Sequence, residues 1–321
     1  MGRVQLLVTG AAGFIGSRLC RVLLERGDSV VGLDNFDPYY ARELKQLHLQ
    51  DIAQHPNFTF HELDLRDEAG VFALFESNQF EAVAHIAAMA AVRYSVQNPL
   101  VYGQVNVQGT AHLLDASRRT TKARCVLAST GSVYGSDTPV PFDEGAPAVH
   151  PLAPYPASKR AMELFAYSFA HLYELPTTVV RFFNVYGPHG RPDMMPWQWS
   201  QKISKGETLT LFNDGHMKRD WTYCDDIVRG FVAALDNPFP WEIINLGGGN
   251  PVENARFVHI LEELVGRKAI IQSAPAPSSE PLETWASIEK AKRLLGWEPQ
   301  IRVEEGLSRF ISWMKQEGFL E

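Results

Sequence analysis

Short apolar runs alternate along the chain with longer segments in which apolar residues recur every three or four positions. The apolar runs predict strands at residues 4–8, 29–33, 58–63, 82–86, 124–128 and 177–182. The longer periodic segments predict helices at residues 17–26, 99–117 and 157–173. Strands that alternate with helices at this spacing are typical of an α/β fold with a doubly wound parallel sheet, the Rossmann arrangement.

The pattern changes beyond Asn184, where prolines, tryptophans and glycines become frequent and the alternation is shorter. We therefore expect a first domain over residues 1–183 and a smaller mixed lobe over residues 184–321 that closes over the carboxyl edge of the sheet. The pattern leaves open a return of part of the second segment to the first domain.

Composition and charge argue against a nucleic-acid-binding or membrane protein. With 321 residues and a formal net charge of −7, the chain offers no bulk positive charge for nucleic acid or a membrane surface. The three cysteines lie far apart without metal-type spacing, which is typical of reduced thiols in the cytoplasm. The longest apolar stretch, residues 82–92, is too short to span a bilayer. We expect a soluble cytoplasmic protein without a bound metal.

A glycine loop follows the first predicted strand. Gly10, Gly13 and Gly16 lie between this strand and the first helix, and Asp34 ends the second strand. Such glycines let the backbone approach a pyrophosphate at a helix N-terminus, while the acid meets a ribose hydroxyl. The G-x-x-G-x-x-G spacing departs from the commonest fingerprint, but its setting predicts a dinucleotide site. Asp34 would repel a 2′-phosphate, so NAD is favoured over NADP.

Tyr155 and Lys159 are four residues apart at the start of a predicted helix, and so lie on one face. A lysine cation near a phenol lowers the phenol's pKa, which makes Tyr155 a candidate general base. Taken alone, the pair is equally typical of a helix surface.

Other positions carry two interpretations each. Asp64, after the third strand, either reaches the adenine end of a cofactor or caps the next helix. The small residues Ala87 and Ala88 after the fourth strand either leave room for a ligand or pack closely. The wide apolar arc of residues 157–173, with residues 100–114, provides either a dimer surface or burial on two sides within one subunit.

Taken in order, these motifs make the chain similar to extended short-chain dehydrogenases/reductases of the sugar-nucleotide epimerase branch. The markers include residues 9–16, Asp34, residues 85–88, Tyr155-x-x-x-Lys159 and the stretch 181–184. Further stretches, at residues 34–40, 92–95, 185–194 and 217–220, resemble UDP-glucuronate 4-epimerases.

The resemblance implies bound NAD, a UDP-sugar substrate, a homodimer and a set of site residues. The implied cofactor-binding residues are Gly10, Ala12, Gly13, Phe14, Ile15, Gly16, Asp34, Asn35, Asp64, Leu65, Ile86, Ala87, Ala88, Asn106, Ser129, Tyr155, Lys159 and Phe182. The implied catalytic residues are Thr130, Tyr155 and Lys159. The implied substrate-binding residues are Arg93, Thr130, Asn184, Arg191, Leu211 and Arg219.

In such a family, Tyr155 takes the proton of the sugar 4-hydroxyl while hydride leaves C4 for NAD, and Thr130 hydrogen-bonds the same oxygen. The 4-keto sugar turns over, and hydride returns to its other face. Lys159 holds the nicotinamide ribose. Dehydratases of this branch carry an Asp-Glu pair after the threonine, and decarboxylases carry a glutamate two residues after it. This chain has Gly131 and Ser132, which favours epimerisation.

The sugar is harder to assign. Arg191 is the candidate for a sugar carboxylate, although it could instead pair with Asp193 or face water. Arg219 is expected at the diphosphate, and Arg93 either contacts a second anion or lies on the dimer surface. Asn184 is typical of neutral-sugar epimerases, so interconversion of UDP-glucose and UDP-galactose, or of their N-acetyl forms, is the alternative.

One stretch departs clearly from the family pattern. The usual Arg-x-Gly-Asp segment is replaced by Pro277-Ser278-Ser279-Glu280. A second phosphate-binding arginine is therefore missing, and we expect the nucleotide to be held differently or more weakly.

Overall fold

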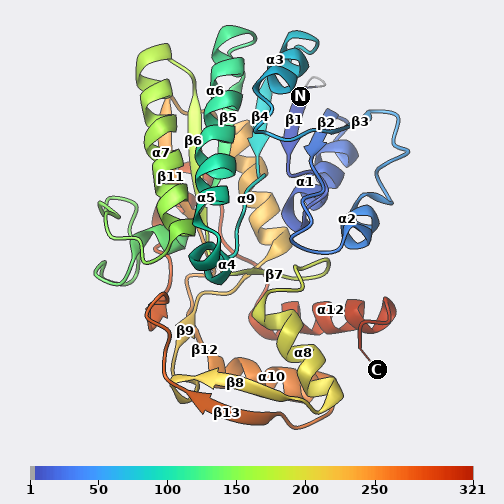
Figure 1. Ribbon diagram of the computed structural model, residues 1–321, viewed down its shortest axis with the longest axis vertical. Coiled ribbons are helices and arrows are strands. Elements are labelled where there is room, and N and C mark those ends of the chain that lie inside the picture. Colours follow the sequence, from blue (N-terminus) through green and yellow to red (C-terminus); the bar gives the residue numbers. More distant parts are fainter. Residues whose placement is uncertain (1–3, 321) are drawn as a thin grey trace.

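The structure is a computed structural model that describes residues 4–320. A seven-stranded sheet in the order β11-β6-β5-β4-β1-β2-β3 forms its upper part (Figure 1), and every pairing in it is parallel. The strands are β1 (Gln5–Thr9), β2 (Ser29–Asp34), β3 (Phe58–Glu62), β4 (Ala82–His85), β5 (Arg124–Thr130), β6 (Thr177–Phe182) and β11 (Trp241–Leu246). The predicted doubly wound parallel sheet is confirmed.

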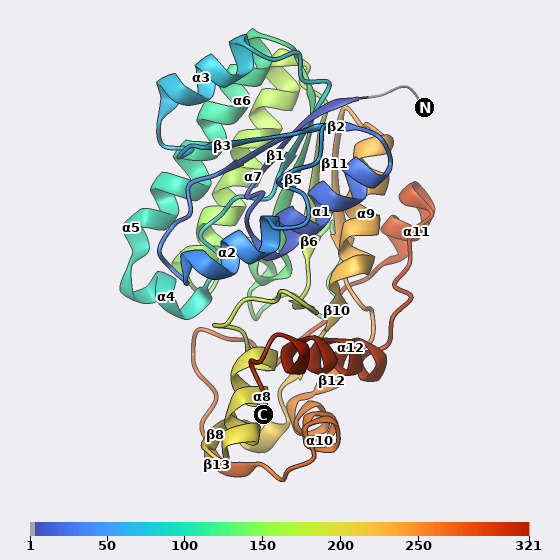
Figure 2. The same cartoon turned by 90° about the vertical axis from the view of Figure 1, so that its right-hand side faces the viewer.

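Helices cover both faces of this sheet (Figure 2). One layer contains α3 (Glu68–Glu76), α6 (Thr110–Arg119) and α7 (Pro154–Tyr173), with the short helices α4 (Val92–Gln97) and α5 (Pro99–Tyr102) at its lower end. The other layer contains α1 (Phe14–Glu25), α2 (Arg42–Leu49), α9 (Cys224–Asp236) and α11 (Glu289–Leu295). The strands bury apolar residues on both faces, as a sheet between two helical layers requires.

The strand order reverses between β1 and β4. Strands β2 and β3 follow on one side of β1, whereas β4, β5 and β6 follow on the other. Loops leaving β1 and β4 at their carboxyl ends therefore diverge, which opens a crevice at that edge of the sheet.

The rest of the chain lies below this edge (Figure 1). Its helices are α8 (Met195–Lys205), α10 (Asn254–Val265) and α12 (Val303–Gln316). Its strands are β7 (Val185–Tyr186), β8 (Thr208–Phe212), β9 (Lys218–Arg219), β10 (Thr222–Tyr223), β12 (Val252–Glu253), β13 (Ile270–Ala274) and β14 (Glu283–Thr284). The chain after Asn184 also returns to the main sheet, because β11 pairs with β6.

The single helix expected over residues 99–117 is wrong in detail. The chain forms α5, then a π-helical segment η1 (Gly103–Gly109), and then α6. Asn106, within η1, donates to Met89 O and to Ser158 Oγ at 2.9 Å and accepts from Met89 N. These bonds tie the π-helical turn to the segment after β4 and to α7, and such turns are frequent at functional sites. Among residues 4–320, no helix combines the length and apolar character needed to cross a bilayer.

A buried ion pair fixes α7 against the sheet. Glu163, on α7, accepts hydrogen bonds at 2.9 and 2.7 Å from Nε and Nη2 of Arg181, on β6. It also accepts from Ser129 Oγ, on β5, at 2.6 Å. The exposed fractions of the Glu163 and Arg181 side chains are 0% and 1%. Burial alone would raise the pKa of Glu163, but the bonds from Arg181 hold it below its usual value.

We expect Glu163→Gln to lower the free energy of unfolding by about 3 kcal/mol, because it leaves the buried Arg181 charge without a counterion. Urea denaturation followed by circular dichroism measures this change. Glu62→Gln is the control, since the Glu62–Arg42 pair is half exposed on both sides and its loss should cost less than about 1 kcal/mol. Equal losses of unfolding free energy in the two variants would show that the buried Glu163–Arg181 pair stabilises the fold no more than an exposed pair does.

Candidate functional site

A cavity of about 760 Å³ lies between the carboxyl edge of the sheet and the lower part of the molecule. The glycine loop, the ends of β4, β5 and β6, and the start of α7 line its upper wall. Residues of α8, β8 and β9 line its lower wall. Two distant parts of the chain thus build one site, as is usual for ligand sites in open α/β sheets.

The glycine loop leaves no room for side chains. Gly10 has φ +71°, and a Cβ there would lie 2.9 Å from Ala87 Cα, while a Cβ on Gly16 would collide with Gly10 O. Helix α1 begins at Phe14, directly after the loop, so its first N–H groups point to the cavity. A backbone without side chains at a helix N-terminus can approach a pyrophosphate closely, and a pyrophosphate is the group that the sequence predicts there.

Asp34 is held at the end of β2. Its Oδ2 accepts from Ala12 N at 3.2 Å, its Oδ1 accepts from Phe36 N at 2.8 Å, and Lys45 Nζ lies 3.6 Å from Oδ1. Asp34 and Asn35 both line the cavity. A carboxylate fixed by these donors keeps lone pairs for ribose hydroxyls, so these residues fit the adenosine half of NAD.

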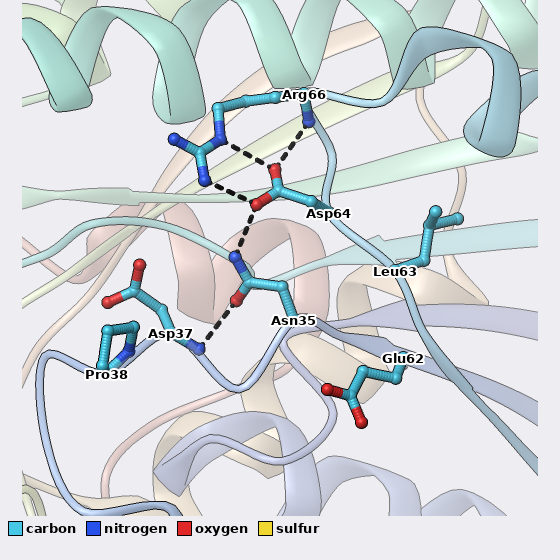
Figure 3. Close-up of a pocket in the computed structure, with 7 residues that line it drawn as sticks. All are labelled: Asn35, Asp37, Pro38, Glu62, Leu63, Asp64 and Arg66. Atoms are coloured by element: carbon cyan, nitrogen blue, oxygen red, sulfur yellow. Dashed lines mark hydrogen bonds and ion pairs between the residues drawn. The ribbon is translucent and has the colours of Figure 1, made fainter.

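A smaller hollow beside Asn35 contains Asp64 and Arg66 (Figure 3). Arg66 grips the Asp64 carboxylate through Nε at 2.9 Å and Nη2 at 2.7 Å, and Asn35 Nδ2 donates to it at 2.8 Å. These bonds, those of Arg66 first, lower the pKa of Asp64 to about 2. The helix-cap interpretation of Asp64 is wrong, because Asp67 caps α3 by accepting from Gly70 N. Asp64 and Leu65 instead line the main cavity.

Thr130, Tyr155 and Lys159 come together at the centre of the cavity. Helix α7 begins at Pro154, so Tyr155 lies in its first turn and Lys159 one turn further. Lys159 Nζ donates to Ala128 O at 2.8 Å, and burial lowers its pKa to about 8. The ammonium group is therefore anchored to β5 while it faces the cavity.

The expected lowering of the Tyr155 pKa by Lys159 is not found. Burial raises the pKa of the Tyr155 phenol, and the groups that oppose this effect are the Thr130 side chain and the Arg191 guanidinium. Desolvation disfavours the phenolate more than these two groups favour it. In this structure the cation that acts on the phenol is Arg191.

The two positions after Thr130 carry no acid. Thr130 Oγ1 accepts from Ser132 N and donates to Ser132 Oγ, both at 3.2 Å. A Cβ on Gly131 would lie 2.6 Å from Cζ of the Phe183 ring. Neither residue carries a carboxyl group, and at Gly131 the Phe183 ring fills the space that one would need.

Arg191 has a partner within the cavity. Its Nε and Nη2 donate to the two oxygens of Asp193 at 2.9 and 2.7 Å, and Tyr39 Oη donates to Asp193 at 3.1 Å. The pairing with Asp193 that the sequence left open is therefore present. It does not turn Arg191 away from the site, because Arg191 lines the cavity. Its Nη1 edge is the part left for a ligand.

Arg93 and Arg219 meet at the other end of the cavity. Arg93 Nη2 lies 3.0 Å from Glu280 Oε1, and Arg219 Nη2 lies 3.1 Å from Glu280 Oε2. The sequence left two interpretations open for Arg93. In the structure Arg93 lies in the cavity wall beside a second arginine. Asn184, which follows β6 with φ +22°, also lines the cavity.

Three residues expected in the site do not line the cavity. Leu211 is 4% exposed and packs in the core, because side chains alternate along β8 and its neighbours Thr210 and Phe212 face the cavity instead. Ala12 is fully buried behind the glycine loop, where its N–H binds Asp34. Asn106 is fully buried and braces the Met89 backbone.

The remaining expected residues all line the cavity. Sequence reasoning missed Tyr39, Lys45 and Phe212, which line it too. The two-residue period of β8 was a signal for Phe212, whereas nothing local indicated that Tyr39 would reach Asp193 across the cavity.

Comparisons with known proteins agree with this geometry. The chain is 43% identical to UDP-glucuronate 4-epimerase of Thermodesulfobacterium geofontis over 311 residues, covering 97% of this chain and 96% of that protein. Its fold matches UDP-glucuronic acid 4-epimerase of Bacillus cereus, solved with UDP-glucuronic acid and NAD, with a TM-score of 0.92, 33% identity and coverage of 98% and 99%. UDP-glucose 4-epimerase of Thermotoga maritima matches with a TM-score of 0.89, 31% identity and the same coverage.

The family comparison covers nearly the whole chain. Residues 7–310 match the family described as GDP-mannose 4,6 dehydratase. The resemblance drawn from the sequence motifs is confirmed, and the chain belongs to this family of extended short-chain dehydrogenases/reductases.

Proposed function

We propose that the protein is a UDP-glucuronate 4-epimerase that works with bound NAD. The observation that carries this proposal is the placement of Tyr155, Thr130 and Arg191 in one cavity with the glycine loop. Relatives named as UDP-glucuronate 4-epimerases, and a neighbour solved with UDP-glucuronic acid and NAD, support it.

In this proposal Tyr155 is the acid–base group. As the phenolate it accepts the proton of the sugar 4-hydroxyl, and as the phenol it returns this proton to the 4-keto oxygen after the sugar has turned over. Thr130 hydrogen-bonds the same oxygen and keeps it near the phenol. NAD, when bound, would supply the acceptor for the C4 hydride and, once reduced, its donor. Lys159 orients the nicotinamide ribose from its anchor on Ala128.

Epimerisation fits this site better than dehydration, although the family is described by a dehydratase. Dehydration needs an acid to protonate the leaving hydroxyl and a base to remove the C5 proton. Gly131 and Ser132 provide neither, and the Phe183 ring closes the space beside Gly131. A 4-keto sugar formed here has no group beside Thr130 to drive elimination.

Arg191 is proposed to bind the sugar carboxylate. Its positive charge acts on the Tyr155 phenol and opposes the rise in the pKa of that phenol. Its pairing with Asp193 holds the guanidinium in place and leaves the Nη1 edge for the substrate. Asn184 in the cavity wall is the feature that favours a neutral sugar instead.

We also propose a homodimer formed through α5 and α7. Leu100 is 80% exposed, and Leu164, Phe165 and Leu172 on α7 are 55%, 46% and 65% exposed. Helices α5 and α7 are in contact, so these exposed apolar side chains lie on neighbouring helices. Exposed apolar side chains gathered on neighbouring elements are typical of an interface between subunits.

A cytoplasmic location is part of the proposal. Cys20, Cys125 and Cys224 are all buried and unpaired, and burial raises the pKa of each thiol. Such thiols are typical of a reducing compartment.

Purified protein incubated with UDP-glucuronate and no added NAD is expected to form UDP-galacturonate, followed by NMR. Tyr155→Phe should lower kcat about 1,000-fold, because the acid–base group is lost. Tyr173→Phe, at the exposed end of the same helix, is the control and should leave kcat unchanged. No epimerisation by the wild-type protein would refute the proposed function.

Arg191→Lys should lower kcat/KM for UDP-glucuronate about 30-fold, since a lysine cannot reproduce the guanidinium's geometry at the carboxylate. The same variant should leave any slow turnover of UDP-glucose unchanged. Equal losses with both sugars would show that Arg191 supports the whole site and does not select the carboxylate.

Light scattering is expected to give about twice the 35.9 kDa mass of the chain. The double variant Leu164→Glu/Leu172→Glu should give monomers, because it places charges in the apolar surface. Ile271→Glu, at a 49% exposed position on β13, is the control and should leave the mass unchanged. Dimers of the double variant would rule out this surface.

A further inference from the structure

Two guanidinium groups converge on one carboxylate at the lower end of the cavity. Glu280 Oε1 accepts from Arg93 Nε at 3.1 Å and Nη2 at 3.0 Å, and its Oε2 accepts from Arg219 Nη2 at 3.1 Å. All three residues line the cavity. The Arg93 side chain is 63% exposed, Glu280 23% and Arg219 10%, so the cluster runs from the cavity mouth inward.

Both arginines also have contacts that do not involve the Glu280 side chain. The Arg93 guanidinium lies over the Phe212 ring, 5.1 Å from its centroid. Arg219 Nη1 donates to the carbonyl oxygens of Lys218 and Leu282 at 2.9 and 3.3 Å. The arginines therefore form a preorganised pair, and Glu280 is a group that fits between them.

This pair is a site for an anion. Two positive charges held close together repel each other unless an anion lies between them. Burial and the charge of Arg93 lower the pKa of Arg219, whereas Glu280 opposes this change. Guanidinium groups bind carboxylate and phosphate oxygens with similar geometry. The protein's own carboxylate thus takes the place that a phosphate group would take.

Glu280 comes from a segment that is fixed only at its ends. Residues 275–282 connect β13, which pairs with β8, to β14, which pairs with β9. Between these strands the described backbone contact of Glu280 is a turn bond to Pro277 O. The segment can therefore move its carboxylate out of the cavity while both strands keep their pairing.

We propose that Glu280 is an internal competitor for the diphosphate of the nucleotide sugar. The Arg93–Arg219 pair binds the diphosphate, and Glu280 leaves the pair when the ligand enters. Glu280 thereby sets the affinity of the site for nucleoside diphosphates. The choice of a nucleoside diphosphate as the ligand rests on the proposed function.

Glu280→Gln is expected to lower the Kd for UDP, measured by calorimetry, about fivefold, because the competing charge is removed. It should lower KM for UDP-glucuronate by a similar factor and leave kcat unchanged. Glu283→Gln is the matched control, since Glu283 pairs with Lys218 at 2.9 Å and should leave both constants unchanged. Arg93→Gln should raise the Kd for UDP, because it removes one of the two cations that bind the diphosphate.

An unchanged or increased Kd for UDP in Glu280→Gln would overturn the proposal, because Glu280 would then support the arginines and not compete with the ligand. The calorimetric test needs no turnover, so its result is separate from that of the epimerase assay. Tighter UDP binding without epimerisation would refute only the proposed reaction. Epimerisation with unaltered UDP binding in Glu280→Gln would refute only the competition.

Discussion

The ion pair between Glu163 and Arg181 is the interaction on which the geometry of the site depends. Glu163 lies one turn after Lys159 on α7, and it binds β5 through Ser129 and β6 through Arg181. Thr130 follows Ser129 directly on β5. The separation between Tyr155 on the helix and Thr130 on the strand is thus set by a buried, hydrogen-bonded charge pair that has little freedom to shift.

Each of the three cavity arginines that are expected to bind the substrate already contacts a carboxylate. Arg191 is paired with Asp193, and Arg93 and Arg219 share Glu280. A ligand with several negative charges therefore meets arginines that already have partners. Binding exchanges one set of ion pairs for another, which moderates affinity.

Much of the fold and of the cavity lining was predictable from residues that are close together in the sequence. The glycine loop and Asp34 are close in the chain to the strands that position them, and the alternation of strands and helices predicted the doubly wound parallel sheet. Other features could not be predicted in this way. Leu211 differs from its cavity-lining neighbours by one residue of strand register, and Asn106 lies in a π-helical turn that no helical period predicts. The partners of Arg93 and Arg191 required contacts between distant segments, and the pKa of Tyr155 required its burial to be known.

The contact between Phe183 and Gly131 bears on how activities diverge within this family. A single codon change at residue 131 would not convert the site to elimination chemistry, because any new side chain would first meet the aromatic ring. Phe183 also packs in a buried cluster with Tyr134 and Phe142, so its own replacement disturbs neighbours. The two positions are epistatic: a path from this sequence towards a dehydratase must reshape the aromatic cluster before an acid at residue 131 can be accommodated.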